Sequence, residues 1–288
     1  MTIQEILNKA INELKECNIQ EPILKARILL AFVLDKSKEY LVINENENLS
    51  NDEQVVFEEA IYRLIQGEPL QHITGMQEFM KLKFIVNKDV LIPRPDTEIL
   101  VEEVVDILNN IENPSVLDLC TGSGAIAISI AKYVKNAYVL GTDISQKAVD
   151  IAIQNATKIM KDDNLTAPSR IQFFQSDLFN NIEGKFDLIV SNPPYIEREE
   201  IKSLDEEVQK EPVMALDGGE DGLEFYKRII LEAYRYIKPE GYLCLEIGYN
   251  QKDKVIKLIE DSGKYYKIYL KKDLAGNDRV VICRSQEK

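Results

Sequence analysis

The sequence predicts an α/β fold: a doubly wound, seven-stranded sheet with an antiparallel last strand, preceded by a small helical domain and a β-hairpin linker. Three observations support this. The first third of the chain shows helical periodicity, residues 75–90 alternate with a period of two, and the remainder alternates apolar runs with helical patterns. Alternation of strands and helices is typical of a sheet covered by helices on both faces.

The helices of the first third have recognisable start signals. Thr2 and Glu5 form a capping-box pair ahead of apolar residues at helical spacing, and Ser50 and Glu53 form a second pair. Pro22 suits the first turn of another helix, because its missing N–H has no partner there in any case. We therefore expect at least three helices before residue 70.

A short hairpin or linker is predicted next. Between residues 75 and 90 the apolar residues Leu82, Phe84 and Val86 alternate with other positions, as in a half-buried strand. We expect this segment to join the helical domain to the sheet.

The seven strands of the sheet are predicted from apolar runs. These are Ser115–Leu119, Ala137–Thr142, Ile171–Gln175, Phe186–Val190, Tyr242–Ile247, Tyr265–Leu270 and Val280–Cys283. The last two runs leave no room for a helix between them. A parallel crossover needs such a helix, so the final strand is expected to be antiparallel.

Composition excludes several classes of function. The 288 residues carry a net charge of −14, which argues against a general phosphate-neutralising surface and against stable nucleic-acid binding. With a single histidine, His72, a multi-histidine zinc site is excluded, and no metal is expected. Four scattered cysteines, no signal peptide and no long apolar run predict a cytoplasmic protein without membrane attachment.

A glycine-rich turn follows the first strand of the sheet. Cys120-Thr121-Gly122-Ser123-Gly124 joins that strand to an alanine-rich helix, and Asp143 ends the next strand. Glycines let the backbone approach a ligand closely, and an acid at that position can accept hydrogen bonds from a ribose diol. The turn lacks the lysine of a phosphate-binding Walker loop and the third glycine of a nicotinamide fingerprint.

A second motif, Asn192-Pro193-Pro194-Tyr195, follows the fourth strand. The prolines remove backbone donors but leave carbonyl acceptors, and the asparagine adds a side-chain acceptor. Such a turn can hold both N–H bonds of a planar amino or amide group, and Tyr195 is expected to stack on the substrate. The predicted catalytic effect is therefore orientation, with Asn192 as the catalytic residue.

Both motifs resemble those of known enzymes. The glycine-rich turn is similar to the first motif of S-adenosylmethionine-dependent methyltransferases, although Cys120 stands where that family usually has glycine. Asn-Pro-Pro-Tyr resembles the signature of methyltransferases acting on planar nitrogens, either of glutamine side chains or of adenine and guanine in nucleic acids. The two motifs alone leave this choice of acceptor open.

Further segments resemble the bacterial release-factor glutamine methyltransferase family, of the HemK type, over essentially the whole chain. They are Gly67–Gly75, Leu91–Glu98, Glu211-Pro212 and Ala215–Gly219. The resemblance implies transfer of a methyl group from S-adenosyl-L-methionine to the glutamine amide of the Gly-Gly-Gln motif in class I peptide chain release factors. An amino methyltransferase of nucleic acid, and one acting on a ribosomal-protein glutamine, are the alternatives.

The resemblance also implies domain limits and site residues. It implies a helical substrate-docking domain at 1–74, a hairpin linker at 75–90 and a methyltransferase domain at 91–288. Some members have an aromatic residue covering the adenine where this chain has Leu178, which is expected to pack there instead. The implied cofactor residues are Cys120, Thr121, Gly122, Ser123, Gly124, Asp143, Leu178 and Asn192, and the implied acceptor residues are Asn192, Pro193, Pro194 and Tyr195.

Overall fold

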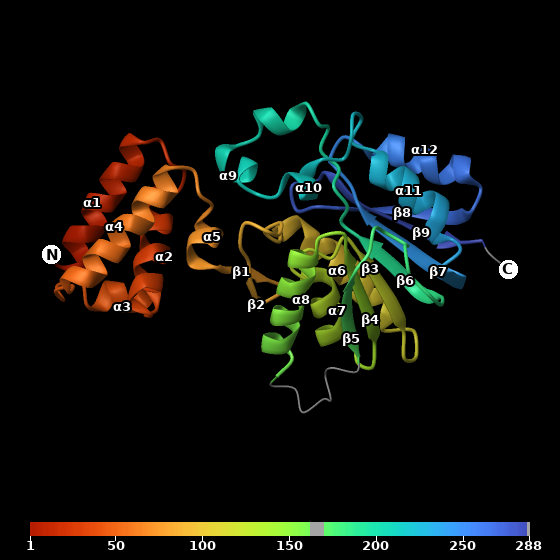
Figure 1. The fold of residues 1–288 in the computed structure, drawn as a ribbon, viewed down its shortest axis with the longest axis horizontal. Helices are drawn as coiled ribbons and strands as arrows, with labels where there is room; N and C mark the ends of the chain where they lie inside the picture. The colour runs from red at the N-terminus through yellow and green to blue at the C-terminus, as the bar shows by residue number, and fades with distance from the viewer. Residues whose placement is uncertain (162–169, 287–288) are drawn as a thin grey trace. The chain divides into compact units, whose positions relative to one another are not determined.

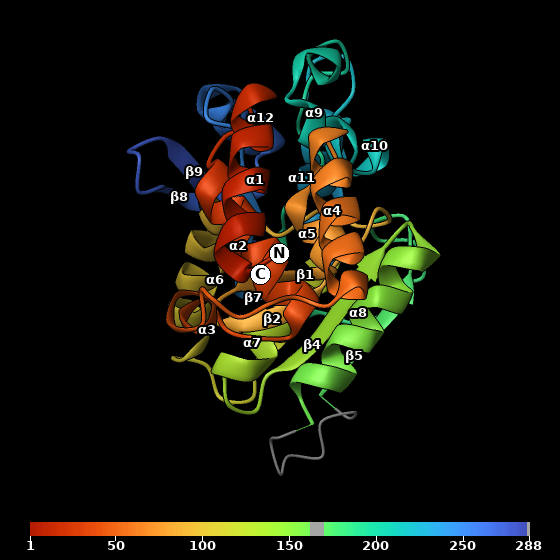
Figure 2. The ribbon, with the colours of Figure 1, turned by 90° about the vertical axis from the view of Figure 1, so that its left-hand side faces the viewer.

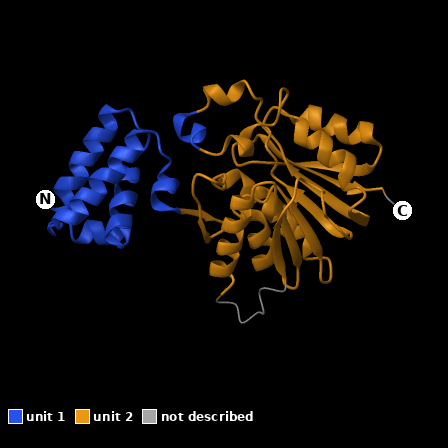
Figure 3. Ribbon diagram, viewed as in Figure 1, with its two compact units in different colours: residues 1–75, 205–210 blue, residues 76–204, 211–288 orange. Residues whose placement is uncertain are grey.

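The computed structural model describes residues 1–161 and 170–286, which divide into two compact units. Unit 1 contains residues 1–75 together with the short segment 205–210, and unit 2 contains residues 76–204 and 211–288 (Figure 3). The chain therefore passes from one unit to the other three times. None of the helices in the described residues has both the length and the apolar character that a membrane span requires.

Unit 1 is helical, as the periodicity predicts. Its helices are α1 (Ile3–Glu16), α2 (Pro22–Leu34), α3 (Lys38–Ile43), α4 (Asn51–Ile65), α5 (Leu70–Thr74) and α9 (Glu206–Gln209). Both predicted capping boxes are present, at Thr2 and at Ser50, and Pro22 occupies the first turn of α2. Helices α1, α2 and α4 pack side by side around a core that includes Leu14, Leu30 and Phe57 (Figures 1 and 2).

Three features of unit 1 are absent from the sequence-based prediction. Helix α3, capped by the Ser37 side chain, and helix α5, which starts directly after Pro69, are each too short for periodicity to show them. The third is the return of the chain in α9, where Lys25 of α2 forms an ion pair with Glu207. That pairing joins residues 182 positions apart, which no local pattern can indicate.

Unit 2 begins with the predicted hairpin and continues into the predicted seven-stranded sheet. The hairpin strands β1 (Met76–Phe79) and β2 (Leu82–Ile85) are antiparallel. The sheet strands are β3 (Ser115–Leu119), β4 (Tyr138–Asp143), β5 (Ile171–Gln175), β6 (Phe186–Ser191), β7 (Ile237–Glu246), β8 (Tyr265–Lys272) and β9 (Asp278–Ser285). Their order is β5-β4-β3-β6-β7-β9-β8, and β9 is antiparallel to both of its neighbours. The predicted fold class, including the antiparallel last strand, is confirmed.

Helices cover both faces of the sheet. The helices of unit 2 are α6 (Pro95–Leu108), α7 (Ala125–Tyr133), α8 (Gln146–Ile159), α10 (Val213–Leu216), α11 (Glu224–Ala233) and α12 (Lys252–Ser262), with a 3₁₀ turn at Glu200–Ser203. Helices α6, α7 and α8 lie on one face and α11 and α12 on the other (Figure 1).

The alternation of side chains along each strand produces these two cores. In β3, Val116 belongs to the core under α6 and α7, whereas Leu117 belongs to the core under α11. In β6, Leu188 and Val190 face the core under α6 and α7, whereas Ile189 faces the core under α11. Strands buried on both faces are nearly continuous apolar runs, which is why the sequence reveals them clearly.

A buried asparagine attaches the hairpin to the sheet unit. Asn155 of α8 accepts a hydrogen bond from the Ile85 N–H (2.6 Å) and donates to the Ile85 carbonyl (3.0 Å) and the Ser123 carbonyl (2.9 Å). Its side chain is completely buried. One residue thus satisfies backbone groups of both β2 and the glycine-rich turn.

We expect Asn155→Ala to lower the free energy of unfolding by about 2–4 kcal/mol, since it leaves several buried backbone groups without partners. Urea denaturation measures this loss. Asn110→Ala is the matched control, because Asn110 is exposed and makes one hydrogen bond within its own turn. Equal midpoints for the two variants would contradict the assigned role of Asn155.

Candidate functional site

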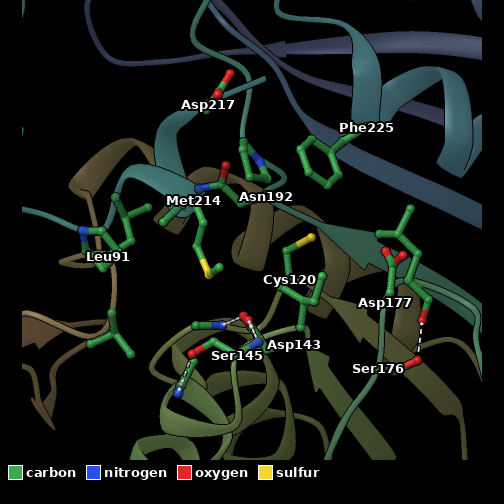
Figure 4. A pocket seen from close by; sticks show the side chains of 18 of the residues that line it. Leu91, Cys120, Asp143, Ser145, Ser176, Asp177, Asn192, Met214, Asp217 and Phe225 are labelled. Carbon is green, nitrogen blue, oxygen red and sulfur yellow. Dashed lines mark hydrogen bonds between the residues drawn. The ribbon is translucent and has the colours of Figure 1, made fainter. Parts of the chain in front are cut away.

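The carboxyl ends of the central parallel strands surround a cavity of about 380 Å³ in unit 2. A cavity of this size is typical of small-molecule sites. Figure 4 shows Cys120 near its middle, with Asp143 on one side and Asn192 and Phe225 on the other. The predicted site residues that line it are Cys120, Gly122, Asp143, Leu178, Asn192 and Pro194.

The other predicted residues lie next to the cavity without lining it. Thr121 donates its hydroxyl proton to Asp118 (2.6 Å), and Ser123 is buried. Gly124, the residue before α7, lies in the left-handed region at φ 80°, and a Cβ added to it would lie 2.9 Å from Cδ1 of Ile128. The Pro193 ring is buried, and the Tyr195 side chain extends toward Glu246.

The glycine-rich turn takes its shape from Asp118, which is wholly buried. One carboxylate oxygen, Oδ2, accepts hydrogen bonds from Thr121 and from the Ala127 N–H (3.2 Å) at the start of α7. The other oxygen has no hydrogen-bond partner among residues 1–161 and 170–286. Burial raises the pKa of Asp118 to about 7, even though its two hydrogen bonds favour the charged form.

Cys120 adopts a backbone conformation that favours glycine. Its φ is 59°, in the left-handed region where a side chain is strained. Glycine would adopt this conformation without that strain. Burial raises the pKa of the Cys120 thiol above its ordinary value, so the sulfur is neutral at physiological pH.

Asp143 holds the glycine-rich turn from the neighbouring strand. Its Oδ2 accepts a hydrogen bond from the Gly122 N–H and its Oδ1 from the Ser145 N–H, each at 2.9 Å. Burial raises its pKa, and these backbone N–H groups oppose the rise. Each carboxylate oxygen keeps a further lone pair that can accept a hydrogen bond from a ligand.

An aromatic side chain enters the cavity from a helix that the sequence analysis did not connect to it. Phe225, in the first turn of α11, lines the cavity together with Leu178 (Figure 4). Arg228, one turn further on, lies over the Phe225 ring (5.9 Å to its centroid) and forms an ion pair with Asp177 (2.7 Å). The apolar side chain of Leu178 and the flat ring of Phe225 are suited to contact the two faces of an aromatic ring.

The Asn-Pro-Pro-Tyr turn is linked to one distant helix and one distant strand. Asn192 donates from Nδ2 to the hydroxyl of Thr97 on α6 (3.2 Å). The Tyr195 hydroxyl donates to Oε1 of Glu246 at the end of β7 (3.4 Å). Thr97 and Glu246 were missed from sequence, although an acid closing an apolar strand is the same signal that identified Asp143.

The segment after this turn folds back onto it. Glu211 is buried and accepts hydrogen bonds from the Ile92 N–H (2.8 Å) and from Arg94. Burial raises the pKa of Glu211, and the positive charge of Arg94 opposes that rise. Asp217, which lines the cavity, accepts from Arg198 (2.8 Å) and from the Gly219 N–H (2.9 Å). Glu211 and Asp217 thus fix the loop that borders the cavity, an arrangement that the spacing of the motifs does not reveal.

Family models match two stretches of the chain, and individual relatives match nearly its whole length. A family model described as the PrmC N-terminal domain matches residues 5–75, and one described as the methyltransferase small domain matches residues 95–222. The chain is 39% identical to the release factor glutamine methyltransferase of Fusobacterium nucleatum, covering 99% of this chain and 79% of that protein. It is 40% identical to the protein of the same name from Clostridium acetobutylicum, covering 98% of each.

The fold has counterparts among solved structures. A methyltransferase from Pyrococcus furiosus superposes with a TM-score of 0.53 at 19% identity, covering 79% of this chain and 98% of that chain. At this identity the likeness concerns the fold.

The buried carboxyl of Asp118 predicts a pH-dependent stability. With its pKa raised from 3.8 to about 7, the folded protein retains a proton that the unfolded chain releases. This contribution is fully present below about pH 4 and is lost as the pH rises to about 7, at ~1.4 kcal/mol per pH unit. We expect unfolding free energies measured between pH 5 and 7 to fall more steeply for the wild type than for Asp118→Asn. Parallel pH dependences would contradict this.

Proposed function

The chain belongs to the release factor glutamine methyltransferase family, and we propose from this premise that it methylates the side-chain amide nitrogen of the Gly-Gly-Gln glutamine in class I release factors. The observation that carries the proposal is the presence of Asn192, Pro194 and Asp143 around one cavity. The Asn-Pro-Pro-Tyr turn, which we call the amide trap, and the acid Asp143 therefore face the same cavity.

The cavity fits S-adenosylmethionine as the methyl donor. We assign Asp143 to the ribose hydroxyls, because both of its oxygens retain an acceptor site beside the hydrogen bonds from Gly122 and Ser145. We assign Leu178 and Phe225 to the two faces of the adenine. Phe225 then supplies the aromatic surface that Leu178, the residue after Asp177, does not provide. When bound, S-adenosylmethionine supplies a methyl group activated by attachment to a sulfonium.

The residues of the Asn-Pro-Pro-Tyr turn orient the acceptor. The Asn192 side-chain oxygen accepts one N–H of the glutamine amide, and a proline carbonyl of the same turn accepts the other. With both N–H bonds held in this way, the nitrogen lone pair would face the methyl group that a bound donor supplies. The new nitrogen–carbon bond would replace the donor's carbon–sulfur bond, whose electron pair would stay on sulfur, and the product nitrogen would release its proton to water. Orientation is the main catalytic effect, and no strong base is required.

Unit 1 is the proposed docking domain for the release factor. This assignment is based on family resemblance: residues 5–75 match the N-terminal domain model of the family. The net charge of −14 favours a protein acceptor over nucleic acid, since both would use the same amide trap.

Methyl transfer from labelled S-adenosylmethionine tests the function. We expect label on the Gly-Gly-Gln glutamine of a class I release factor, and none on RNA, DNA or a release factor in which that glutamine is alanine. Label on nucleic acid or on a ribosomal-protein glutamine, with none on the release factor, would overturn the proposal. In the same assay, Asn192→Ala should lower kcat by about a hundredfold, while the variant remains folded. A kcat like that of the wild type would contradict the amide trap.

Asp143→Ala should weaken cofactor binding, because the variant loses an acceptor for the ribose and the hydrogen bonds that hold Gly122 and Ser145. Loss of a hydrogen bond to a charged group corresponds to about 1.5–3 kcal/mol. Isothermal titration with S-adenosylmethionine measures the change. The matched control is Asp150→Ala, on the exposed side of α8; a dissociation constant equal to that of this control would refute the assignment.

A further inference from the structure

The two prolines in the middle of the amide trap leave it without backbone donors there. Pro193 and Pro194 carry no N–H, so their peptide groups cannot be held by hydrogen bonds that they donate. The first end of the trap is fixed by β6, because Ser191 is paired within the sheet with both β3 and β7. The position of the proline carbonyls therefore depends on what holds the other end, at Tyr195.

Gln251 holds that other end. It directly precedes α12, is 4% exposed, and donates from Nε2 to the carbonyls of Tyr195 (2.8 Å) and Gly222 (3.2 Å). Its Oε1 accepts from the Gly248 N–H (3.0 Å) and lies 3.3 Å from the Tyr226 hydroxyl. A backbone N–H can only donate and a carbonyl can only accept, so these partners allow one orientation of the side-chain amide.

The loop that borders the cavity lies against the same end of the trap. The Ile196 N–H donates to the Leu216 carbonyl (3.0 Å), and the Gly218 N–H donates to the Ile196 carbonyl (2.8 Å). A Cβ added to Gly218 would lie 2.7 Å from Cα of Tyr195, and one added to Gly222 would lie 2.6 Å from the Tyr195 carbonyl oxygen. The glycines of this loop are therefore required by a close backbone contact with the trap.

Gln251 thus joins three segments that are distant in the sequence: the amide trap, the loop at Gly222, and the turn between β7 and α12. Planar peptide bonds connect Tyr195 to the proline carbonyls, so a shift at Tyr195 is passed on to them. A misplacement on the order of 1 Å in an orienting group can cost about a hundredfold in rate. A reaction that depends on orientation is therefore sensitive to this contact.

We propose that Gln251 is a positioning residue for methyl transfer, which fixes the Tyr195 end of the amide trap and thereby the proline carbonyl that accepts an N–H of the acceptor. Gln251 does not line the cavity that the described residues form, so it acts through the trap. This inference rests on the proposed function, because it takes methyl transfer to an amide nitrogen as the reaction.

The first test removes the amide of Gln251 and keeps the length of its side chain. Gln251→Met should lower kcat for methylation of the release factor by about tenfold or more, because the Tyr195 and Gly222 carbonyls lose their donor. The dissociation constant for S-adenosylmethionine should change far less, since the residues assigned to the ribose and the adenine are unchanged. The matched control is Gln286→Met, because Gln286 is exposed and also donates to a backbone carbonyl, that of Tyr265 (3.0 Å).

Two results of this test would overturn the inference. One is a kcat for Gln251→Met equal to that of Gln286→Met. The other is a loss of cofactor affinity as large as the loss in kcat, because the effect would then not be confined to the acceptor side of the site. A wild-type protein that transfers no methyl group to the release factor would instead overturn the proposed function.

The second test crowds the same carbonyl and leaves Gln251 in place. Gly222→Ala adds a Cβ that would lie 2.6 Å from the Tyr195 carbonyl oxygen and 2.7 Å from Nε2 of Gln251. Gly263→Ala is the matched control, because Gly263 has a similar φ (62° against 68°) but nothing within 4 Å of an added Cβ. Both variants carry the backbone strain, so only Gly222→Ala should lower kcat, by about tenfold. Equal kcat values for the two variants would overturn the inference.

Discussion

Leu119 pairs with Thr142 on one side and with Ser191 on the other, and this register determines where the site forms. The next residue of each strand is Cys120, Asp143 or Asn192, so the glycine-rich turn, the acid and the amide emerge side by side at one edge of the sheet. A slip of one residue would turn each side chain to the opposite face. The two apolar cores, which bury alternate residues of the same strands, make such a slip costly.

Buried carboxyl groups hold the parts of this edge together. Asp118 binds the turn to the start of α7, Asp143 binds the same turn to β4, and Glu211 binds the segment at Ile92 and Arg94 to the loop beside the cavity. Burial raises the pKa of each of these three carboxyls. The site therefore obtains its rigidity from groups that are individually costly to bury when charged.

Much of the fold and the contiguous motifs could be predicted from the sequence. Capping boxes, a proline at the first turn of α2 and unbroken apolar strands are local signals, and they place the main helices and all seven strands. The connections between distant segments could not be predicted. Thr97 contacts Asn192, and Glu246 contacts Tyr195, only because α6, β6 and β7 are neighbours in space. Phe225 enters the cavity from a helix about 50 residues after Leu178. Helix α3 is too short to show a period.

The three passages of the chain between its units have a consequence for attempts to separate them. Residues 205–210 belong to the helical unit, although they lie between the Asn-Pro-Pro-Tyr turn and Glu211 in the sequence. A protein starting at residue 76 would leave Glu207 without Lys25 and would lack the rest of the unit to which α9 belongs. Such a truncation would perturb the loop that borders the cavity as well as remove the proposed docking surface. Substitutions on the exposed faces of α1 and α4 separate the two effects, because they leave the connection through residues 205–210 intact.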